Sequence, residues 1–251
     1  MNLKIATRDL NTSLYADELR IKSLTWFDKY APPEFKEWKR KHTSYVLFND
    51  DNHSTDFDKD FRLPPNIEKT HALIMAFFYL KQASDTINQC EYYFRRFPFS
   101  GLPVSKPDHL RNICEFYFNT IYVGHERIKV ALSKLNDACP NISIDFNKTL
   151  KRYKKQFEQE LKNRHSITHD SIPFDDRGID KVMIMELNLS SFSHQDKIWK
   201  NESIFAYRQE AKKWAKRVNR QGVAMNQFVE AVAEAILKHA ELLPDKTARG
   251  G

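Results

Sequence analysis

The interpretation of this chain depends on ten residues, which read Leu161-Lys162-Asn163-Arg164-His165-Ser166-Ile167-Thr168-His169-Asp170. Apolar residues at spacings of three and four precede them and predict one face of a helix: Leu150, Tyr153, Phe157 and Leu161. The next position on that face is Arg164. Because an unpaired charge is costly to bury, an arginine at this position needs a partner or a ligand.

A histidine follows this arginine near the expected end of the helix. Pro173 disfavours helical angles at Ile172, so we expect the helix to end between Thr168 and Ile172. His169 lies about 140° from Arg164 on an ideal helix, and beyond the helix end it can turn back toward the arginine. Such an arginine can hold a phosphate with two hydrogen bonds, and a histidine can transfer a proton. In the structural alternative, Arg164 extends to solvent and His169 caps the helix.

The segment Arg164-His165-Ser166-Ile167-Thr168-His169 resembles the signature of the HEPN superfamily, in which arginine is followed by four to six residues and then histidine. In that family the residue after the arginine is commonly Asn, Asp or His, and His165 fits. The resemblance covers about residues 66–243 and rests on the motif and the order of the helices. It implies a mainly all-α protein built on a HEPN-like four-helix bundle.

The same resemblance implies an activity. Active HEPN members are metal-independent RNA endonucleases that work as dimers, often as toxins or antiviral effectors. Arg164 would hold the scissile phosphate, and His169 would transfer a proton or hydrogen-bond the phosphate while the ribose 2′-hydroxyl attacks. Asn163, His165 and Asp170 are supporting candidates, although Asn163 and Asp170 could equally serve only to complete the helix end. The expected partners are RNA, a second copy of the chain and an antitoxin or activator protein, with no cofactor and no metal.

The composition favours a helical cytoplasmic protein. Of the 251 residues 41% are hydrophobic and only 6 are glycine, which is enough apolar content for one sizeable core. The 3 cysteines form no CxxC motif, and Cys90 and Cys114 are predicted to be buried thiols. The chain has no apolar run near about 18 residues, and its N-terminus lacks the apolar core of a signal peptide, so we expect no membrane span. The net charge of +7 favours an anionic partner.

The chain divides into three parts. We predict an N-terminal extension over 1–65 that packs on the core, a helical bundle over 66–243 and a flexible tail over 244–251. Long helical patterns cover about residues 66–97, 106–137, 145–168 and 201–243. Two short apolar stretches, 43–48 and 181–189, predict strands of a small β element. The acidic stretch 49–66 predicts a loop.

Three of the helical patterns carry apolar rows. The first row comprises Leu73, Phe77, Leu80, Ser84, Ile87 and Phe94. The second comprises Leu110, Cys114, Tyr117, Ile121, Gly124, Ile128, Ala131 and Leu135. The last pattern carries Tyr207, Ala211, Trp214 and Val218, followed by Phe228, Val232 and Ile236. Gly124 would let a neighbouring helix approach closely, and Gly222 would kink the last helix.

A basic cluster in the last helical pattern is a candidate for binding the RNA backbone. It comprises Arg208, Lys212, Lys213, Lys216, Arg217 and Arg220. These residues would cover much of the face away from Trp214, with Glu210 alone to offset them. The alternative is a solvated helix face with no ligand.

Other chemistries find less support in the sequence. His165 and His169 lie four residues apart and could share a metal, and the His169-Asp170 pair is similar to that of HD phosphohydrolases, with His125 and Asp196 completing the set. The chain has no Gly-rich phosphate loop, so ATP or NAD binding is not indicated. A HEPN bundle that binds RNA or a protein without cleavage remains the main alternative function.

Overall fold

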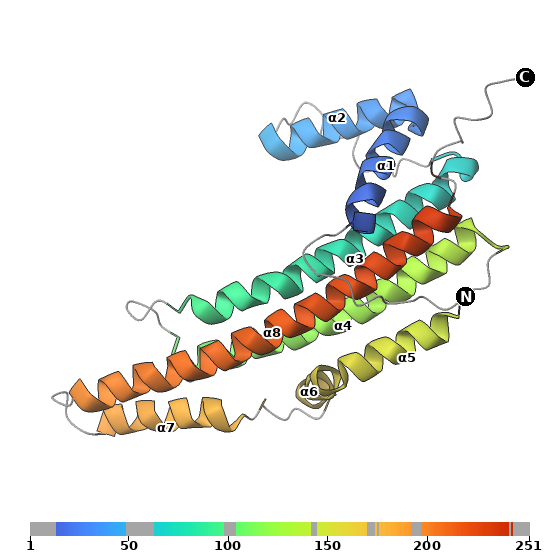
Figure 1. Ribbon diagram of the computed structural model, residues 1–251. Coiled ribbons are helices and arrows are strands. Elements are labelled where there is room, and N and C mark those ends of the chain that lie inside the picture. Colours follow the sequence, from blue (N-terminus) through green and yellow to red (C-terminus); the bar gives the residue numbers. More distant parts are fainter. Residues whose placement is uncertain are drawn as a thin grey trace, which may run out of the picture.

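The computed structural model describes residues 14–48, 63–97, 104–141, 145–169, 174, 176–191, 197–240 and 242 (Figure 1). Every regular element among these residues is a helix, so the fold is all-α as predicted. The helices are α1 (Leu14–Tyr30), α2 (Pro33–Phe48), α3 (Pro65–Arg95), α4 (Lys106–Ala138), α5 (Phe146–Gln156), α6 (Glu158–His169), α7 (Arg177–Ser191) and α8 (Lys197–His239). No described helix is long and apolar enough to span a membrane. The predicted tail over 244–251 and most of the predicted loop over 49–66 lie outside the described residues.

Local signals in the sequence set the bounds of several helices. The hydroxyl oxygen of Ser105 accepts a hydrogen bond from the backbone N–H of Asp108, and Pro107 occupies the first turn of α4. At the start of α5 the carboxylate of Asp145 accepts from the backbone N–H of Lys148 at 3.0 Å. Proline likewise occupies the first turn of α3. Each of these devices satisfies or removes a backbone donor that has no partner within its own helix.

Three long helices, α3, α4 and α8, form the centre of the molecule (Figure 1). α3 runs antiparallel to α4 and α8, while α5 and α7 lie along the bundle, and α7 packs on α8. α1 packs on α8 through its buried residues Ala16, Leu19 and Trp26, and the backbone N–H of Tyr15 donates to Glu230 Oε2 at 2.9 Å. The molecule is therefore a bundle of three long helices, flanked on one side by three shorter ones.

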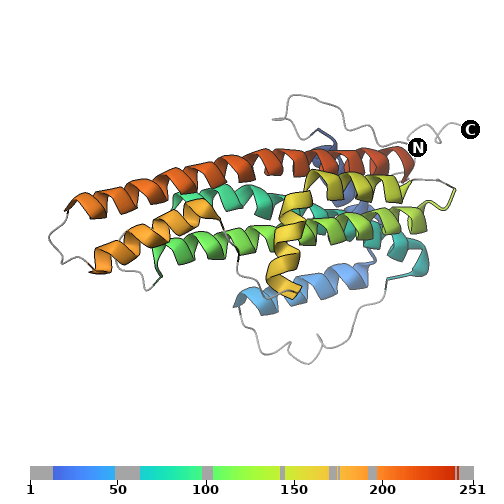
Figure 2. The same ribbon diagram turned by 90° about the horizontal axis from the view of Figure 1, so that it is seen from below.

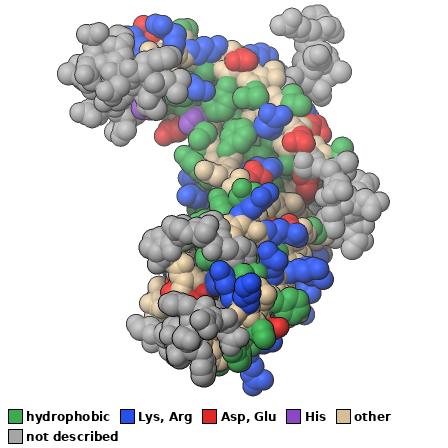
Figure 3. Space-filling view, turned by 90° about the vertical axis from the view of Figure 1, so that its left-hand side faces the viewer, with side chains coloured by type: hydrophobic (Ala, Val, Ile, Leu, Met, Phe, Trp, Pro, Cys, Tyr) green, Lys and Arg blue, Asp and Glu red, His purple; other side chains and the backbone are tan. Residues whose placement is uncertain are grey.

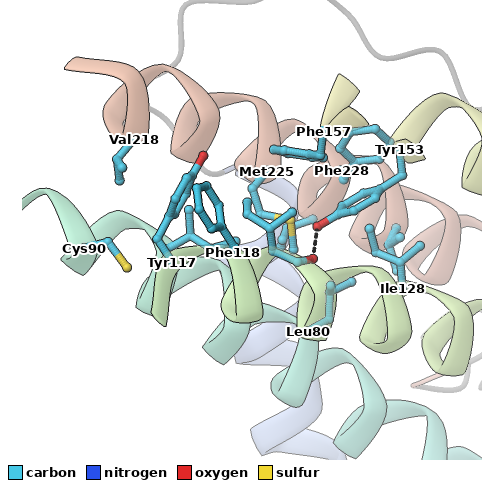
Figure 4. Packing of buried hydrophobic residues seen from close by; sticks show 14 of the residues in the cluster. Leu80, Cys90, Tyr117, Phe118, Ile128, Tyr153, Phe157, Val218, Met225 and Phe228 are labelled. Atoms are coloured by element: carbon cyan, nitrogen blue, oxygen red, sulfur yellow. Dashed lines mark hydrogen bonds between the residues drawn. The ribbon is translucent and has the colours of Figure 1, made fainter. Parts of the chain in front are cut away.

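The apolar rows predicted from the sequence form the core. The predicted core residues of α3 and α4 are all buried, as are both apolar rows of α8. Figure 4 shows side chains from these helices interleaved with Tyr153 and Phe157. The Tyr153 hydroxyl donates to the backbone carbonyl of Ile121 at 2.7 Å, and a Cβ at Gly124 would lie 2.7 Å from the same hydroxyl oxygen. Gly124 thus permits the close helix approach that the sequence predicted.

The last helix differs from the prediction at Gly222. α8 continues through this residue as one helix of 43 residues. A Cβ at Gly222 would collide with the side-chain oxygen of Asn88 on α3. The glycine is therefore explained by the tight packing of α3 against α8, and the prediction of a kink was wrong.

The predicted β element is also wrong, because both stretches are helical. Residues 43–48 form the end of α2, and residues 181–189 lie within α7. In α7 the buried residues Ile179 and Val182 follow helical spacing. Two ion pairs tie this helix to α4: Lys106 with Glu186 at 2.6 Å and Arg111 with Asp180 at 3.2 Å. The β-forming tendency of a short apolar run is thus overridden by packing against two long helices.

The predicted helix over 145–168 is interrupted at Phe157. This residue has φ −112° and ψ 25°, and it separates α5 from α6. Tyr153 and Phe157 are both fully buried, with ring centres 4.5 Å apart, and each faces Phe228 of α8. After the break α6 turns away from the line of α5 and crosses α4, as Figures 1 and 2 together show. The break directs the end of α6, with its Arg–His motif, across the outside of the bundle.

Candidate functional site

The helix that carries the motif is anchored by a buried carboxylate. Glu160 of α6 is only 1% exposed, and its Oε1 accepts from Arg217 Nε of α8 at 2.9 Å. The Tyr117 hydroxyl of α4 donates to the same oxygen at 3.3 Å. Gln221 Nε2 lies 3.4 Å from it and Gln156 Nε2 donates to the Gln221 side chain at 2.9 Å. This network joins α5, α6, α4 and α8, and it holds the helix one turn before Arg164.

Arg164 lies on the ring of Tyr122. Its guanidinium carbon is 4.1 Å from the ring centre, a distance at which the cation is attracted by the aromatic face. Its Nε is buried without a hydrogen-bond partner in the described structure. This stacking explains how an arginine can continue an apolar helix face, because the flat guanidinium packs on an aromatic side chain.

Arg164 and His169 are in contact, as the sequence predicted. Arg164 Nη1 is 3.3 Å from His169 Nε2. His169 is the last residue of α6, so the predicted helix end is confirmed, but the histidine remains helical and does not turn back beyond the helix. The length of the arginine side chain bridges the gap instead.

The contact constrains the protonation of His169. A guanidinium only donates hydrogen bonds, so the bond requires a lone pair on Nε2 and therefore a neutral imidazole with its proton on Nδ1. Among the described residues no carboxylate lies within ion-pairing distance of Arg164, whereas Arg217 and Arg111 each have one. An arginine that is fixed in place and lacks an acidic partner is suited to binding an anion.

The supporting candidates are placed less tightly. His165 is exposed, and its ring centre lies 4.7 Å from that of His169. The amide oxygen of Asn163 accepts from Gln159 Nε2 at 2.9 Å, and within the described chain its side chain has no hydrogen bond to Arg164 or His169. Asp170 lies outside the described residues. His165 is therefore the supporting candidate that the structure brings to the pair.

The basic cluster of α8 divides into engaged and exposed cations. Arg217 is bound to Glu160, and Lys213 pairs with Glu210 at 2.7 Å and with Asp176 at 3.4 Å. The others are exposed: Arg208, Lys212, Lys216 and Arg220. Lys212, Lys216 and Arg220 follow one another at intervals of four residues and form a row along the helix. Figure 3, which views the end of the molecule where α8 begins, shows Lys and Arg side chains gathered along one flank.

The pairing at Lys213 includes two carboxyl groups with opposite pKa shifts. Burial raises the pKa of Glu210, despite a hydrogen bond from Lys213. Burial would also raise the pKa of Asp176, but hydrogen bonds from the backbone N–H of Gly178 and the charge of Lys213 lower it. Asp176 is thus held ionised at the start of α7, and Lys213 serves this pair as an ion partner.

The residues proposed for other sites are separated or outside the described chain. His125 is buried beside Tyr153, and its Nδ1 is 3.0 Å from Glu126 Oε1. Asp170 and Asp196 lie outside the described residues. Within the described residues no group of three or more His, Cys, Asp or Glu is arranged to hold a metal. Cys90 and Cys114 are buried thiols as predicted, and burial raises the pKa of Cys90 to about 12.

Two residues of the site were missed by the sequence analysis. Tyr122 belongs to the apolar stretch of α4, and nothing in its neighbourhood marks it as the support of an arginine. Glu160 carried a usable signal, because it lies three residues after the buried Phe157 and four before Arg164, on the inner face of the helix. Comparison of the chain with models of protein families, with curated proteins and with solved structures found no match.

Proposed function

We propose that the protein is a metal-independent endoribonuclease of HEPN type. The observation that carries the proposal is the contact between Arg164 and His169 on the outer part of α6, with the guanidinium held on Tyr122 and without a carboxylate partner among the described residues. The resemblance of the motif to the HEPN signature supplies the reaction. A role as a toxin or antiviral effector, controlled by an antitoxin or activator protein, follows from that resemblance.

In the proposed reaction the RNA supplies its own nucleophile. The ribose 2′-oxygen attacks the adjacent phosphorus, the bond to the 5′-oxygen breaks, and the products are a 2′,3′-cyclic phosphate and a 5′-hydroxyl. Arg164 would bind the phosphate oxygens and stabilise the additional negative charge of the transition state. His169, neutral in the resting contact, would accept the proton of the 2′-hydroxyl through Nε2 once the phosphate takes over the guanidinium hydrogen bonds.

Binding and assembly complete the proposal. The exposed cations of the α8 basic cluster would bind the RNA backbone, while Arg217 serves the ion pair with Glu160. A second copy of the chain would bring another Arg164 and His169 to the same cleft, because one Arg–His pair alone is a sparse site.

The test is cleavage of a single-stranded RNA by the purified protein in the presence of EDTA. We expect cyclic-phosphate ends, no cleavage of the 2′-deoxy analogue, and a rate reduced by about 10² or more in Arg164→Ala and in His169→Ala. Arg152→Ala, which removes an exposed arginine of the neighbouring helix α5, is the matched control and should keep full activity.

Three results would contradict the proposal. These are loss of cleavage on adding EDTA, equal cleavage of the 2′-deoxy substrate, and full activity of His169→Ala in preparations free of other nucleases. Tight RNA binding without any cleavage would favour the non-catalytic binding module instead.

A further inference from the structure

An exposed apolar stripe crosses the junction of α3 and α4. It consists of Tyr79, Thr86 and Tyr93 on α3 and Phe116, Val123 and Val130 on α4, and we call it the α3–α4 stripe. Its five apolar members are each 40–46% exposed. In each helix the members recur every seven residues, which places them in one row per helix. The stripe is a continuous feature of the surface, whereas scattered exposed apolar residues would need no explanation.

The two rows of the stripe lie side by side. α3 and α4 are antiparallel, and the rings of Tyr93 and Phe116 meet at one end with centres 6.3 Å apart. Near the other end the guanidinium of Arg127 lies 4.9 Å from the ring centre of Tyr79. From Tyr79 to Tyr93 the stripe is about 21 Å long, at 1.5 Å per helical residue.

The surroundings of the stripe carry few charges. Its exposed neighbours on both helices are uncharged polar residues: Gln82, Gln89, Asn112, Asn119 and Ser133. The charged residues among its close neighbours on α4, Glu126 and Arg127, have opposite signs. This face is thus close to neutral in a chain with a net charge of +7 and 29% charged residues. Depletion of charge around exposed aromatic side chains is typical of the centre of a protein–protein interface.

We propose that the α3–α4 stripe binds the same stripe of a second copy of the chain. Seven-residue rows pack against other helical rows of the same spacing, and this chain itself supplies them. A two-fold axis through Val123 would set Phe116 of one subunit against Val130 of the partner subunit, because these two residues are equally distant from Val123 along α4. The neutral face allows two chains of positive net charge to meet there, whereas RNA would find Arg127 beside a carboxylate.

This surface specifies the dimer that the proposed function requires, but its evidence is independent of Arg164 and His169. The stripe and the Arg–His pair share no residue, so either can fail alone. A face of this length lies at the lower end of interface sizes, and we therefore expect a dissociation constant on the order of micromolar.

Charge substitutions at Val123 test both the surface and the axis. Light scattering or native mass spectrometry of the full chain at about 100 µM, well above the expected dissociation constant, should give the mass of a dimer. Val123→Glu and Val123→Lys should each be monomeric, because like charges would meet at the axis. An equimolar mixture of the two variants should restore a dimer that contains one copy of each.

The controls separate this surface from folding and from catalysis. Ile198→Glu places the same charge on an exposed apolar residue of α8 and should remain dimeric, as should Arg164→Ala. Val130→Glu provides a second break of the stripe if either Val123 variant loses its helical circular dichroism. A monomeric natural protein at about 100 µM, a dimeric Val123→Glu, or a mixture that stays monomeric would each overturn the proposal. Weakened RNA binding by Val123→Glu with unchanged mass would assign the face to RNA and overturn it as well.

Discussion

A guanidinium that lies flat on an aromatic ring keeps its N–H edge available for hydrogen bonds, and Arg164 is held in this way on Tyr122. The ring replaces the carboxylate that usually fixes a buried or half-buried arginine. A carboxylate would compete with a phosphate for the same N–H groups, whereas the ring face does not. Tyr122 therefore positions Arg164 without neutralising it.

Substitution of Tyr122 tests this role. Tyr122→Phe retains the ring and should cleave RNA at nearly the natural rate. Tyr122→Ala should lower kcat/KM by about tenfold, which corresponds to roughly 1.4 kcal/mol and lies within the range of cation–π attraction. The measurement is steady-state cleavage, with circular dichroism to verify the helix content. Equal activity of the two variants would mean that the ring does not position the arginine.

The Arg164–His169 pair was predictable from the sequence, but its support was not. Arg164 interrupts a regular apolar face, and His169 follows close to a proline-defined helix end, so both carried a signal. Tyr122 is 42 residues away from Arg164 in the chain, in a helix whose apolar residues are otherwise explained by the core. Periodicity along one helix does not say which residue of another helix it meets.

At the level of elements, the break at Phe157 and the anchor at Glu160 determine where the motif lies. The apolar spacing from Leu150 to Leu161 fits one continuous helix and fits two helices separated by one residue equally well. The choice depends on the packing of Tyr153 and Phe157 against Phe228, which is a distant part of the chain. The same limitation explains the two stretches that were predicted as strands and are helices.

Removal of the Glu160 carboxylate should loosen the bundle. Glu160→Ala leaves Arg217, whose side chain is 30% exposed, without its partner, and we expect a loss of about 3 kcal/mol in the free energy of unfolding. The double variant Glu160→Met, Arg217→Met should lose less, because no unpaired charge remains. Urea denaturation measures both. Glu158→Ala, which breaks an exposed ion pair with Lys162, is the control and should leave stability nearly unchanged. A double variant less stable than Glu160→Ala would contradict this account.

At the scale of the whole molecule, the periodic rows of α3, α4 and α8 made the core predictable, since three long amphipathic helices can bury their apolar faces only against one another. The path of α5, α6 and α7 was not predictable, because short helices take their direction from the surface on which they pack. The basic row of α8 was visible in the sequence, but the involvement of Arg217 and Lys213 in ion pairs depends on neighbouring helices.

The exposed row Lys212, Lys216 and Arg220 should contribute to RNA binding through the backbone. Replacing all three with glutamine should weaken binding uniformly across RNA sequences and reduce the salt slope by about one for each phosphate that the row neutralises. Fluorescence anisotropy at several salt concentrations measures both effects. The control replaces Arg20, Arg40 and Lys69, three exposed cations of α1, α2 and α3, and removes the same net charge. If both triple variants change the slope equally, the row acts only through net charge.

The position of α8 at the end of the described chain has a consequence for protein synthesis. α8 contacts α1, α3, α4 and α7, and it supplies Arg217, which follows Glu160 by 57 residues. A ribosome that adds about 5–20 residues per second needs roughly 3–11 s to make that interval. Throughout this time Glu160 has no Arg217 to bind, so α6 is not yet fixed on the bundle. We expect a nascent chain to carry the complete Arg–His motif for several seconds before the structure that positions it exists.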